Sequence, residues 1–188
     1  MISTIGHSTH PIEEFIVILK AHSVQQLIDI RTVPRSRKNP QFNRETLPVS
    51  LEGESIAYEH LPGLGGLRRP RPDSINTAWR NASFRGYADY MQTPEFAANI
   101  DRLIELAHRQ GTAIMCAEAV QWRCHRSLVA DALVARGIPV QHIHSAKRAQ
   151  PHHLTSFARL QGTRIVYAED GPLTGCSGID RPSPDTLG

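Results

Sequence analysis

The sequence predicts an α/β fold in which a mostly parallel sheet is flanked by helices. Short apolar runs of strand length alternate along the chain with stretches of helical periodicity. The intervals between these runs suit the crossover connections that parallel strands require. Polar and reactive residues directly follow several of the runs, and such sheets bind ligands at the carboxyl ends of their strands. We therefore expect a single domain over residues 1–168 with a polar cleft at that edge.

In the first half of the chain, three apolar runs predict strands, namely Ile2–Ile5, Val24–Ile30 and Ser55–Tyr58. Pro11, followed by two acidic residues, is typical of a first helical turn, and apolar spacing continues this helix to about His22. A short helix is expected around Asn43–Glu52. The stretch from Pro62 to Ala82 is rich in Gly, Pro and Arg and lacks periodicity, which predicts a functional or mobile loop.

In the second half, helical patterns cover Tyr87–Met91 and a stretch that Pro94 opens and Gly111 ends. The run Ala113–Ala117 predicts a buried strand, and a helix is expected from Cys124 to Gly137. Three further elements complete the prediction: a strand at Ile138–Ile143, a helix around His152–Leu160 and a strand at Arg164–Tyr167. Residues 169–188 are rich in Gly, Pro, Ser and Asp, which is typical of a flexible tail.

The composition is that of a soluble globular protein, with 188 residues, 40% hydrophobic and 21% charged. No apolar run approaches the roughly 20 residues that span a bilayer, and the first residues lack the pattern of a secretion signal. We therefore expect a cytoplasmic protein without a membrane partner. Three cysteines make no disulfide framework and indicate free thiols in a reducing compartment, although a Cys116–Cys124 bridge across the turn is geometrically conceivable.

Basic residues are segregated along the chain, although the net charge is only +3. Residues 31–44 contain five basic side chains and no acid, and residues 61–88 contain five arginines against Asp73 alone. Such clustering predicts an anionic ligand, either a small molecule or a nucleic acid, because clustered like charges are costly unless an opposite charge compensates them. Two solvated basic loops are the alternative interpretation.

The stretch from Thr112 to Gly137 places reactive side chains between a strand and a helix. Free N–H groups and the helix dipole at such a point favour anions and lower the pKa of a thiol. Cys124 is therefore the candidate nucleophile, whereas Cys116, inside the apolar run, is expected to be a core residue. The other candidates are Glu118 and Asp29 as acid or base, Arg31, Arg126, Arg35 and Arg68 as anion binders, and His7, His60 and His125 as groups that tune or relay protons.

Several motifs occur together in order along the chain. They are Thr4-Ile5-Gly6-His7-Ser8, Asp29-Ile30-Arg31 with Pro34 and Ser36, Tyr58 with His60, Leu64-Gly65-Gly66, Phe84-Arg85-Gly86-Tyr87, Tyr90-Met91, and Met115-Cys116-Ala117-Glu118 with Cys124-His125-Arg126. This pattern resembles the domain of unknown function 488 family over roughly Ile2 to Tyr167. The resemblance implies one α/β domain in a bacterial or archaeal cytoplasmic protein. It implies no particular reaction and leaves the cofactor open, and some members carry a loose DNA-repair label.

Three functions are compatible with these residues. The first is an enzyme in which Cys124 attacks a phosphate, sulfur or acyl centre. The setting is similar to the strand–loop–helix of rhodaneses and cysteine phosphatases, but Cys124 lies at the far end of a loop without glycine, which suits a phosphate cradle poorly. The second is a zinc or iron site using some of Cys116, Glu118, Cys124 and His125, with His7 or His60 as a further candidate ligand. The third is nucleic-acid binding, suggested by Trp79, Phe84 and Tyr87 among arginines.

Overall fold

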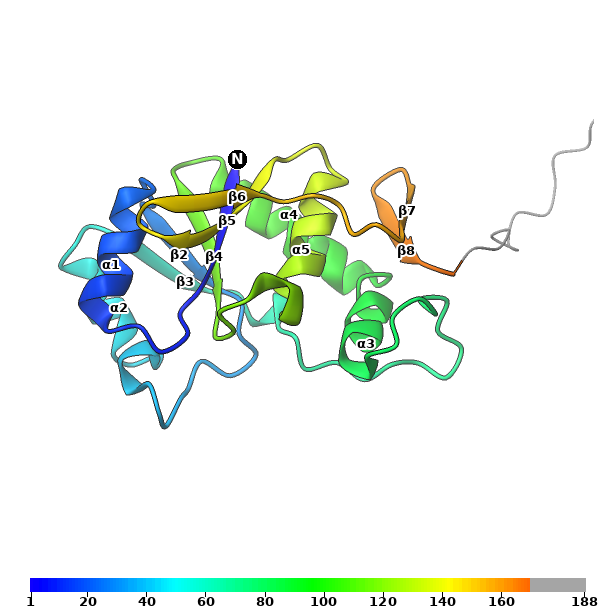
Figure 1. Ribbon diagram of the computed structural model, residues 1–188, viewed down its shortest axis with the longest axis horizontal. Helices are drawn as coiled ribbons and strands as arrows, with labels where there is room; N and C mark the ends of the chain where they lie inside the picture. Colours follow the sequence, from blue (N-terminus) through cyan, green and yellow to red (C-terminus); the bar gives the residue numbers. More distant parts are fainter. Residues whose placement is uncertain (170–188) are drawn as a thin grey trace, which may run out of the picture.

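The computed structural model describes residues 1–169 and confirms the mostly parallel sheet flanked by helices (Figure 1). The six-stranded sheet has the order β3-β2-β4-β1-β5-β6. Its parallel strands are β1 (Ile2–Gly6), β2 (Gln26–Asp29), β3 (Ala57–His60), β4 (Thr112–Cys116) and β5 (Val140–Ser145). The edge strand β6 (Arg148–Pro151) is antiparallel to β5. Apart from its first residue, the predicted tail, which includes Cys176, lies outside the described residues.

Helices cover both faces of this sheet (Figure 1). On one face lie α1 (Ile12–Ala21) and α2 (Leu47–Glu52), and on the other lie α3 (Ala82–Tyr90), α4 (Pro94–Ala107) and α5 (Arg126–Val134). The alternation of side chains along each strand feeds the two resulting cores. In β2, for example, Leu27 packs with the α1 and α2 residues, whereas Ile28 packs with those of α4 and α5.

The chain leaves neighbouring strands toward opposite faces at the carboxyl edge of the sheet. β1 continues into α1 on one face, and its neighbour β4 continues into α5 on the other. The strands end level, because Gly6 pairs with Cys116 and Asp29 pairs with Met115. A divergence of this kind opens a crevice at the carboxyl ends of the strands. The fold therefore places the residues after β1, β2 and β4 around one space.

The predicted helix around His152–Leu160 is wrong. This segment runs as a loop and then as β7 (Ala158–Gln161), which pairs antiparallel with β8 (Arg164–Tyr167). The buried carboxylate of Asp131 on α5 accepts hydrogen bonds from the backbone N–H of Thr155, at 3.0 Å, and from its hydroxyl, at 2.7 Å. These bonds fix the loop in a non-helical form, which local sequence periodicity cannot reveal.

Other boundaries differ modestly from the predictions. Helix α2 begins four residues later than expected, and α3 begins five residues earlier. Strand β3 is shifted so that His60 is its last residue. Three 3-10 turns, η1 (Pro40–Phe42), η2 (Pro62–Leu64) and η3 (Gln121–Arg123), lie in the loops. None of the helices within residues 1–169 is long and apolar enough to cross a bilayer.

A chain of buried polar side chains joins β1 to the end of the described chain. The hydroxyl of Thr4 lies 2.7 Å from His142 Nδ1, and His142 Nε2 lies 2.9 Å from His152 Nδ1. His152 Nε2 in turn lies 2.8 Å from Asp131, which also accepts a hydrogen bond from the Tyr167 hydroxyl at 2.8 Å. Because the carboxylate only accepts, each imidazole in this chain donates from Nε2 and accepts at Nδ1. The chain fixes both tautomers and ties β8 to the sheet.

Candidate functional site

A cavity of about 450 Å³ lies at the carboxyl ends of β1, β2 and β4. The residues that line it come from the end of β4, from the loops after these three strands, from the loop that precedes α3 and from the first turn of α3. They are His7, Arg31, Thr32, Val33, Arg35, Ser36, Gly66, Leu67, Ser83, Phe84, Cys116, Ala117, Glu118, Arg123, Cys124 and His125. Of the predicted site residues, the structure therefore brings together His7, Arg31, Arg35, Cys116, Glu118, Cys124 and His125 around one cavity.

Two thiols and an imidazole meet on one side of this cavity. The sulfur atoms of Cys116 and Cys124 and a ring nitrogen of His125 all lie within 4.8 Å of one another. Cys124 Sγ is 3.7 Å from His125 Nδ1. Both cysteines are buried and free, so the conceivable bridge between them is not formed. Cys124 is extended and lies two residues before α5, so the helix begins two residues later than the sequence predicts.

The two thiols have opposite shifts in pKa. A hydrogen bond from Cys116, together with the positive charge and backbone N–H of Arg126, lowers the pKa of Cys124 to about 6 against the cost of burial. The same contact with Cys124, together with burial, raises the pKa of Cys116 to about 12. At neutral pH the pair therefore consists of a Cys124 thiolate that accepts a hydrogen bond from a Cys116 thiol.

Arg126 lies beneath the cavity and does not line it. Its side chain is 1% exposed, and its Nη2 donates to the carbonyl oxygens of Glu118, at 2.7 Å, and Ala119, at 3.4 Å. These bonds tie the loop after β4 to the first turn of α5. Arg126 therefore acts on the site through its charge and through the loop that it holds.

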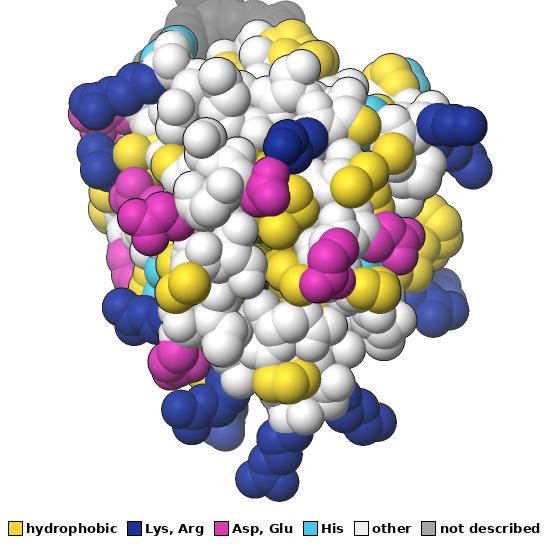
Figure 2. All heavy atoms as spheres, turned by 90° about the vertical axis from the view of Figure 1, so that its left-hand side faces the viewer, with side chains coloured by type: hydrophobic (Ala, Val, Ile, Leu, Met, Phe, Trp, Pro, Cys, Tyr) yellow, Lys and Arg dark blue, Asp and Glu magenta, His cyan; other side chains and the backbone are white. Residues whose placement is uncertain are grey.

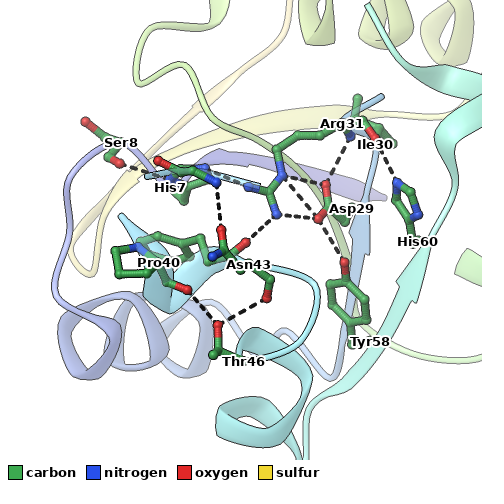
Figure 3. Close-up of polar contacts among 12 residues, drawn as sticks. His7, Ser8, Asp29, Ile30, Arg31, Pro40, Asn43, Thr46, Tyr58 and His60 are labelled. Carbon is green, nitrogen blue, oxygen red and sulfur yellow. Dashed lines mark hydrogen bonds and ion pairs between the residues drawn. The ribbon is translucent and has the colours of Figure 1, made fainter. Parts of the chain in front are cut away.

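Arg31 is the anion-binding candidate that the structure fixes most firmly (Figure 3). Its guanidinium donates to both carboxylate oxygens of Asp29 and, from Nη2, to the carbonyl oxygen of Phe42 at 2.7 Å. Nη1 lies 3.1 Å from His7 Nε2. Asp29 and Arg31 are 0% and 6% exposed, and the hydroxyl of Tyr58 donates to Asp29 at 2.9 Å. Of the five N–H groups of a guanidinium, one on Nη1 has no acceptor among the described residues and is free for a ligand.

His7 holds the other end of Arg31. Its Nε2 accepts from Arg31, so the ring proton is on Nδ1, which donates to the Ser8 carbonyl oxygen at 2.9 Å. The ring stacks on Phe42 with the centroids 4.2 Å apart. Burial and the charge of Arg31 lower the pKa of His7 to about 4. His7 is therefore neutral at physiological pH, and the lone pair on its Nε2 already accepts the hydrogen bond from Arg31.

We expect the protein to lose stability in mild acid because of buried neutral histidines. Burial lowers the pKa of His7 to about 4 and that of His142 to about 3, from an ordinary 6.5. Between about pH 6.5 and these lowered values, each of the two histidines binds a proton in the unfolded chain but not in the folded chain. The free energy of unfolding then decreases by about 1.4 kcal/mol per pH unit for each histidine.

Urea denaturation between about pH 7 and pH 4 measures this dependence. His142→Gln removes one of the two groups and reduces the slope by about half. His153→Gln, at an exposed position, is the matched control and leaves the slope unchanged. A slope that is the same in all three proteins contradicts the assignment.

Four predicted residues do not line the cavity. Asp29 and Arg126 are buried behind it, and His60 donates from Nε2 to the Arg31 carbonyl oxygen at 2.8 Å. Arg68 lies over the ring of Tyr90, 3.6 Å from its centroid. Asp29 and His60 therefore hold Arg31 in place from its side chain and its backbone. Glu118, in contrast, is exposed at the cavity with its carboxylate free of described partners.

Several lining residues are not among the site residues that the sequence predicts, namely Thr32, Val33, Leu67, Ser83 and Arg123. Ser36 and Phe84 appear in the sequence motifs, and Phe84 also among the aromatic residues that suggested nucleic-acid binding, but neither is predicted to line a cavity. Gly66 had only a weak signal, as one of two adjacent glycines. A Cβ at Gly66 would lie 2.4 Å from His125 Nδ1. The loop after η2 thus passes directly against the imidazole, and only glycine permits this approach.

Cys116, Cys124 and His125 also form the one group within residues 1–169 whose positions suit a metal ion. Two thiolates and an imidazole are ligands for zinc, and the adjoining cavity leaves a fourth position open. Glu118, which the sequence suggested as a further ligand, does not belong to this group. His125 Nε2 lies 3.4 Å from the Ile30 carbonyl oxygen, which would orient the ring toward the sulfur atoms.

The aromatic residues that suggested nucleic-acid binding pack largely against the protein. Trp79 stacks on Phe84 and contacts Phe157 and Tyr167, and Tyr87 is fully buried. Many of the basic side chains, in contrast, project from the surface. Figure 2 shows Lys and Arg side chains projecting from the lower end of the molecule, where Figure 1 places the loop after β2. This positive end is the one that carries the cavity.

Comparison with known proteins identifies the family of the chain. The sequence model of a family described as Domain of unknown function DUF488 matches residues 11–133. Neither the curated proteins nor the solved structures gave a match. The matched residues include β2, β4, both described cysteines and most of the cavity lining. The chain therefore belongs to the DUF488 family, as the resemblance of its motifs predicted.

Proposed function

We propose that the protein is an enzyme in which the thiolate of Cys124 attacks an electrophilic centre of an anionic substrate. The observation that carries this proposal is the position of Cys124, which lines the cavity beside Cys116 and His125 and shares it with Arg31. A nucleophilic thiolate requires stabilisation by nearby donors and positive charge. Cys116 and Arg126 supply both.

The remaining residues take distinct roles in this proposal. Arg31 offers its free N–H to the substrate anion, and Arg35 and Arg123 add positive charge at the opening. Asp29, His7 and His60 are positioning residues, because each of them contacts Arg31, although His7 also lines the cavity. Glu118, exposed at the cavity, is the group available to exchange a proton with a leaving group.

Alkylation of Cys124 tests the proposal without knowledge of the substrate. In a Cys176→Ser background, the rate of reaction with iodoacetate should rise with a midpoint near pH 6, because the pKa of Cys124 is lowered to about 6. The ratio of the alkylation rate with iodoacetate to the rate with neutral iodoacetamide should also be about tenfold higher for Cys124 than for a small free thiol at low salt. Alkylation quenched at a series of times and followed by mass spectrometry gives both rates.

Two variants serve as controls. Cys124→Ser abolishes the fast reaction, and Cys116→Ala raises the midpoint because the thiolate loses its first hydrogen-bond donor. A midpoint near the ordinary thiol value of about 8.5, with no preference for the anionic reagent, rules out an activated nucleophile in an anion site.

A metal centre is the second candidate function, favoured by the convergence of Cys116, Cys124 and His125. The same assay distinguishes it. A bound ion blocks alkylation of both cysteines until a chelator removes it, and metal analysis then finds a stoichiometric ion. If both cysteines react at once in protein that was purified without a chelator, this alternative is excluded.

A further inference from the structure

We infer that Cys124 and Cys116 act as a pair in thiol–disulfide exchange, with an anionic disulfide as the substrate. The inference rests on the proposed function, since Cys124 remains the nucleophile, and it names the electrophile as sulfur. It also gives Cys116, which the sequence assigns to the core, a chemical role as the resolving thiol.

The first supporting observation is the position of Cys116. Its sulfur atom lies within 4.8 Å of both Cys124 Sγ and a ring nitrogen of His125, and the residue lines the same cavity. Nucleophilic attack on phosphorus or a carbonyl carbon uses the second thiol only as a hydrogen-bond donor to the Cys124 thiolate. Exchange with a disulfide uses it as a reactant, because a second thiol releases the enzyme from the mixed disulfide that the first step forms.

The second observation concerns the backbone N–H groups around Cys124. Those of Arg123, Cys124 and Ser127 donate to the carbonyl oxygens of Val120, Gln121 and Cys124, at 3.2, 3.0 and 3.1 Å, and that of Arg126 donates to the sulfur of Cys124 itself. Phosphoryl and acyl transfer develop charge on oxygen, which needs such N–H groups free. In disulfide exchange the charge develops on the departing sulfur, so occupied N–H groups are no obstacle.

The reaction balances with the residues of the site, the disulfide and one proton from water. The Cys124 thiolate attacks one sulfur of the disulfide, the S–S bond breaks, and the first half leaves as a thiolate that takes a proton from water. Cys116 passes its proton to His125 and attacks Cys124 Sγ. The second half leaves as a thiolate and takes the proton from His125. The two cysteines are oxidised to a disulfide, and the substrate is reduced to two thiols.

The residues that line the cavity indicate further features of the substrate. Arg123 has no acidic partner among the described residues, Arg35 has only the exposed Glu45 at 3.7 Å, and Arg31, whose charge Asp29 balances, keeps one N–H for a ligand. A carboxylate or comparable anion on the disulfide is therefore favoured. Val33 and Leu67, which line the same cavity, are 61% and 79% exposed. Apolar side chains left open at a cavity mouth suit a substrate with an apolar portion beside its charge.

Single-turnover reaction with disulfides of opposite charge tests the inference. Reduced Cys176→Ser protein is mixed at neutral pH with dithiodiglycolate, which is anionic, or with cystamine, which is cationic. We expect release of both halves of dithiodiglycolate and a Cys116–Cys124 bridge by mass spectrometry. The anionic disulfide should react at least about tenfold faster than cystamine at low salt, after correction for their rates with a small thiol. Cys116→Ser should stop at the mixed disulfide on Cys124 and release one half only.

The outcomes separate this inference from the proposed function. If the protein with both cysteines also stops at the mixed disulfide, the pairing of the thiols is overturned while the Cys124 nucleophile stands. If Cys124 is alkylated readily but neither disulfide reacts, sulfur is the wrong electrophile. If alkylation itself shows no activation, the proposed function fails and the inference fails with it.

Discussion

Asp29→Asn is expected to lower the free energy of unfolding by about 3–5 kcal/mol, because it leaves a buried charge without its partner. Arg31 is 6% exposed and forms its ion pair with Asp29 at 2.6 Å. The asparagine keeps one acceptor oxygen but cannot balance the guanidinium charge. Its NH2 group would also face the donors of Arg31 and Tyr58, which now point at the carboxylate. Urea denaturation at neutral pH measures the loss.

Tyr58→Phe is the matched control for this prediction. It removes one hydrogen bond to Asp29 and leaves the ion pair intact, so the expected cost is about 1 kcal/mol. The two variants should also differ at the cavity. Asp29→Asn raises the preference of Cys124 for iodoacetate, because it leaves the charge of Arg31 unbalanced beside the cavity, whereas Tyr58→Phe leaves the preference unchanged. Equal costs for the two variants contradict the assigned role of Asp29.

Gly6→Ala is expected to destabilise the protein by at least about 3 kcal/mol, at the upper end of the range for overpacking. A Cβ at Gly6 would lie 2.0 Å from the carbonyl oxygen of Glu118, and backbone cannot rotate away as a side chain can. The end of β1 and the loop after β4 would have to separate. This movement would pull on the hydrogen bond that Arg126 donates to the same carbonyl oxygen.

Gly53→Ala provides the comparison for Gly6→Ala. Gly53 has φ −58° and ψ −18°, which any residue adopts, and a Cβ there would meet no atom closer than 4.0 Å. Its effect should stay within about 1 kcal/mol and is expected to stabilise. Thermal and urea denaturation of both variants, with Cys124 alkylation as the site readout, check the pair. A Gly6→Ala protein as stable as Gly53→Ala would show that β1 and the loop are not tightly apposed.

The sequence predicts the placement of some site residues because parallel strands end at one edge. His7, Arg31 and Glu118 follow the apolar runs of β1, β2 and β4, and all three line the cavity. Asp29 does not, since it lies within β2 two residues after Leu27 and shares its face of the sheet. Alternation along the strand thus sends the carboxylate toward the α1 and α2 layer, while Arg31 reaches around to the opening.

Other features depend on contacts between distant segments. Cys116 ends an apolar run and is 9% exposed, as a core residue would be. Its place beside Cys124 arises only when the loop after β4 folds back, which no local pattern encodes. The failed helix around His152–Leu160 has the same origin, because Asp131 on another element fixes Thr155. Family and fold class follow from local motifs and periodicity, whereas the thiol pair follows from tertiary structure.

The position of β1 in the middle of the sheet has a consequence for the order of folding. Its two neighbours are β4 and β5, whose residues follow it by more than a hundred positions, and Thr4 meets His142 across a separation of 138 residues. During synthesis β1 therefore waits without a strand partner until residues 112–145 have left the ribosome. Such long-range pairing slows folding and prolongs the exposure of apolar strands. Both thiols of the cavity belong to this late segment, so they are open to oxidants from their own emergence until Arg126 and the loop after β4 enclose them.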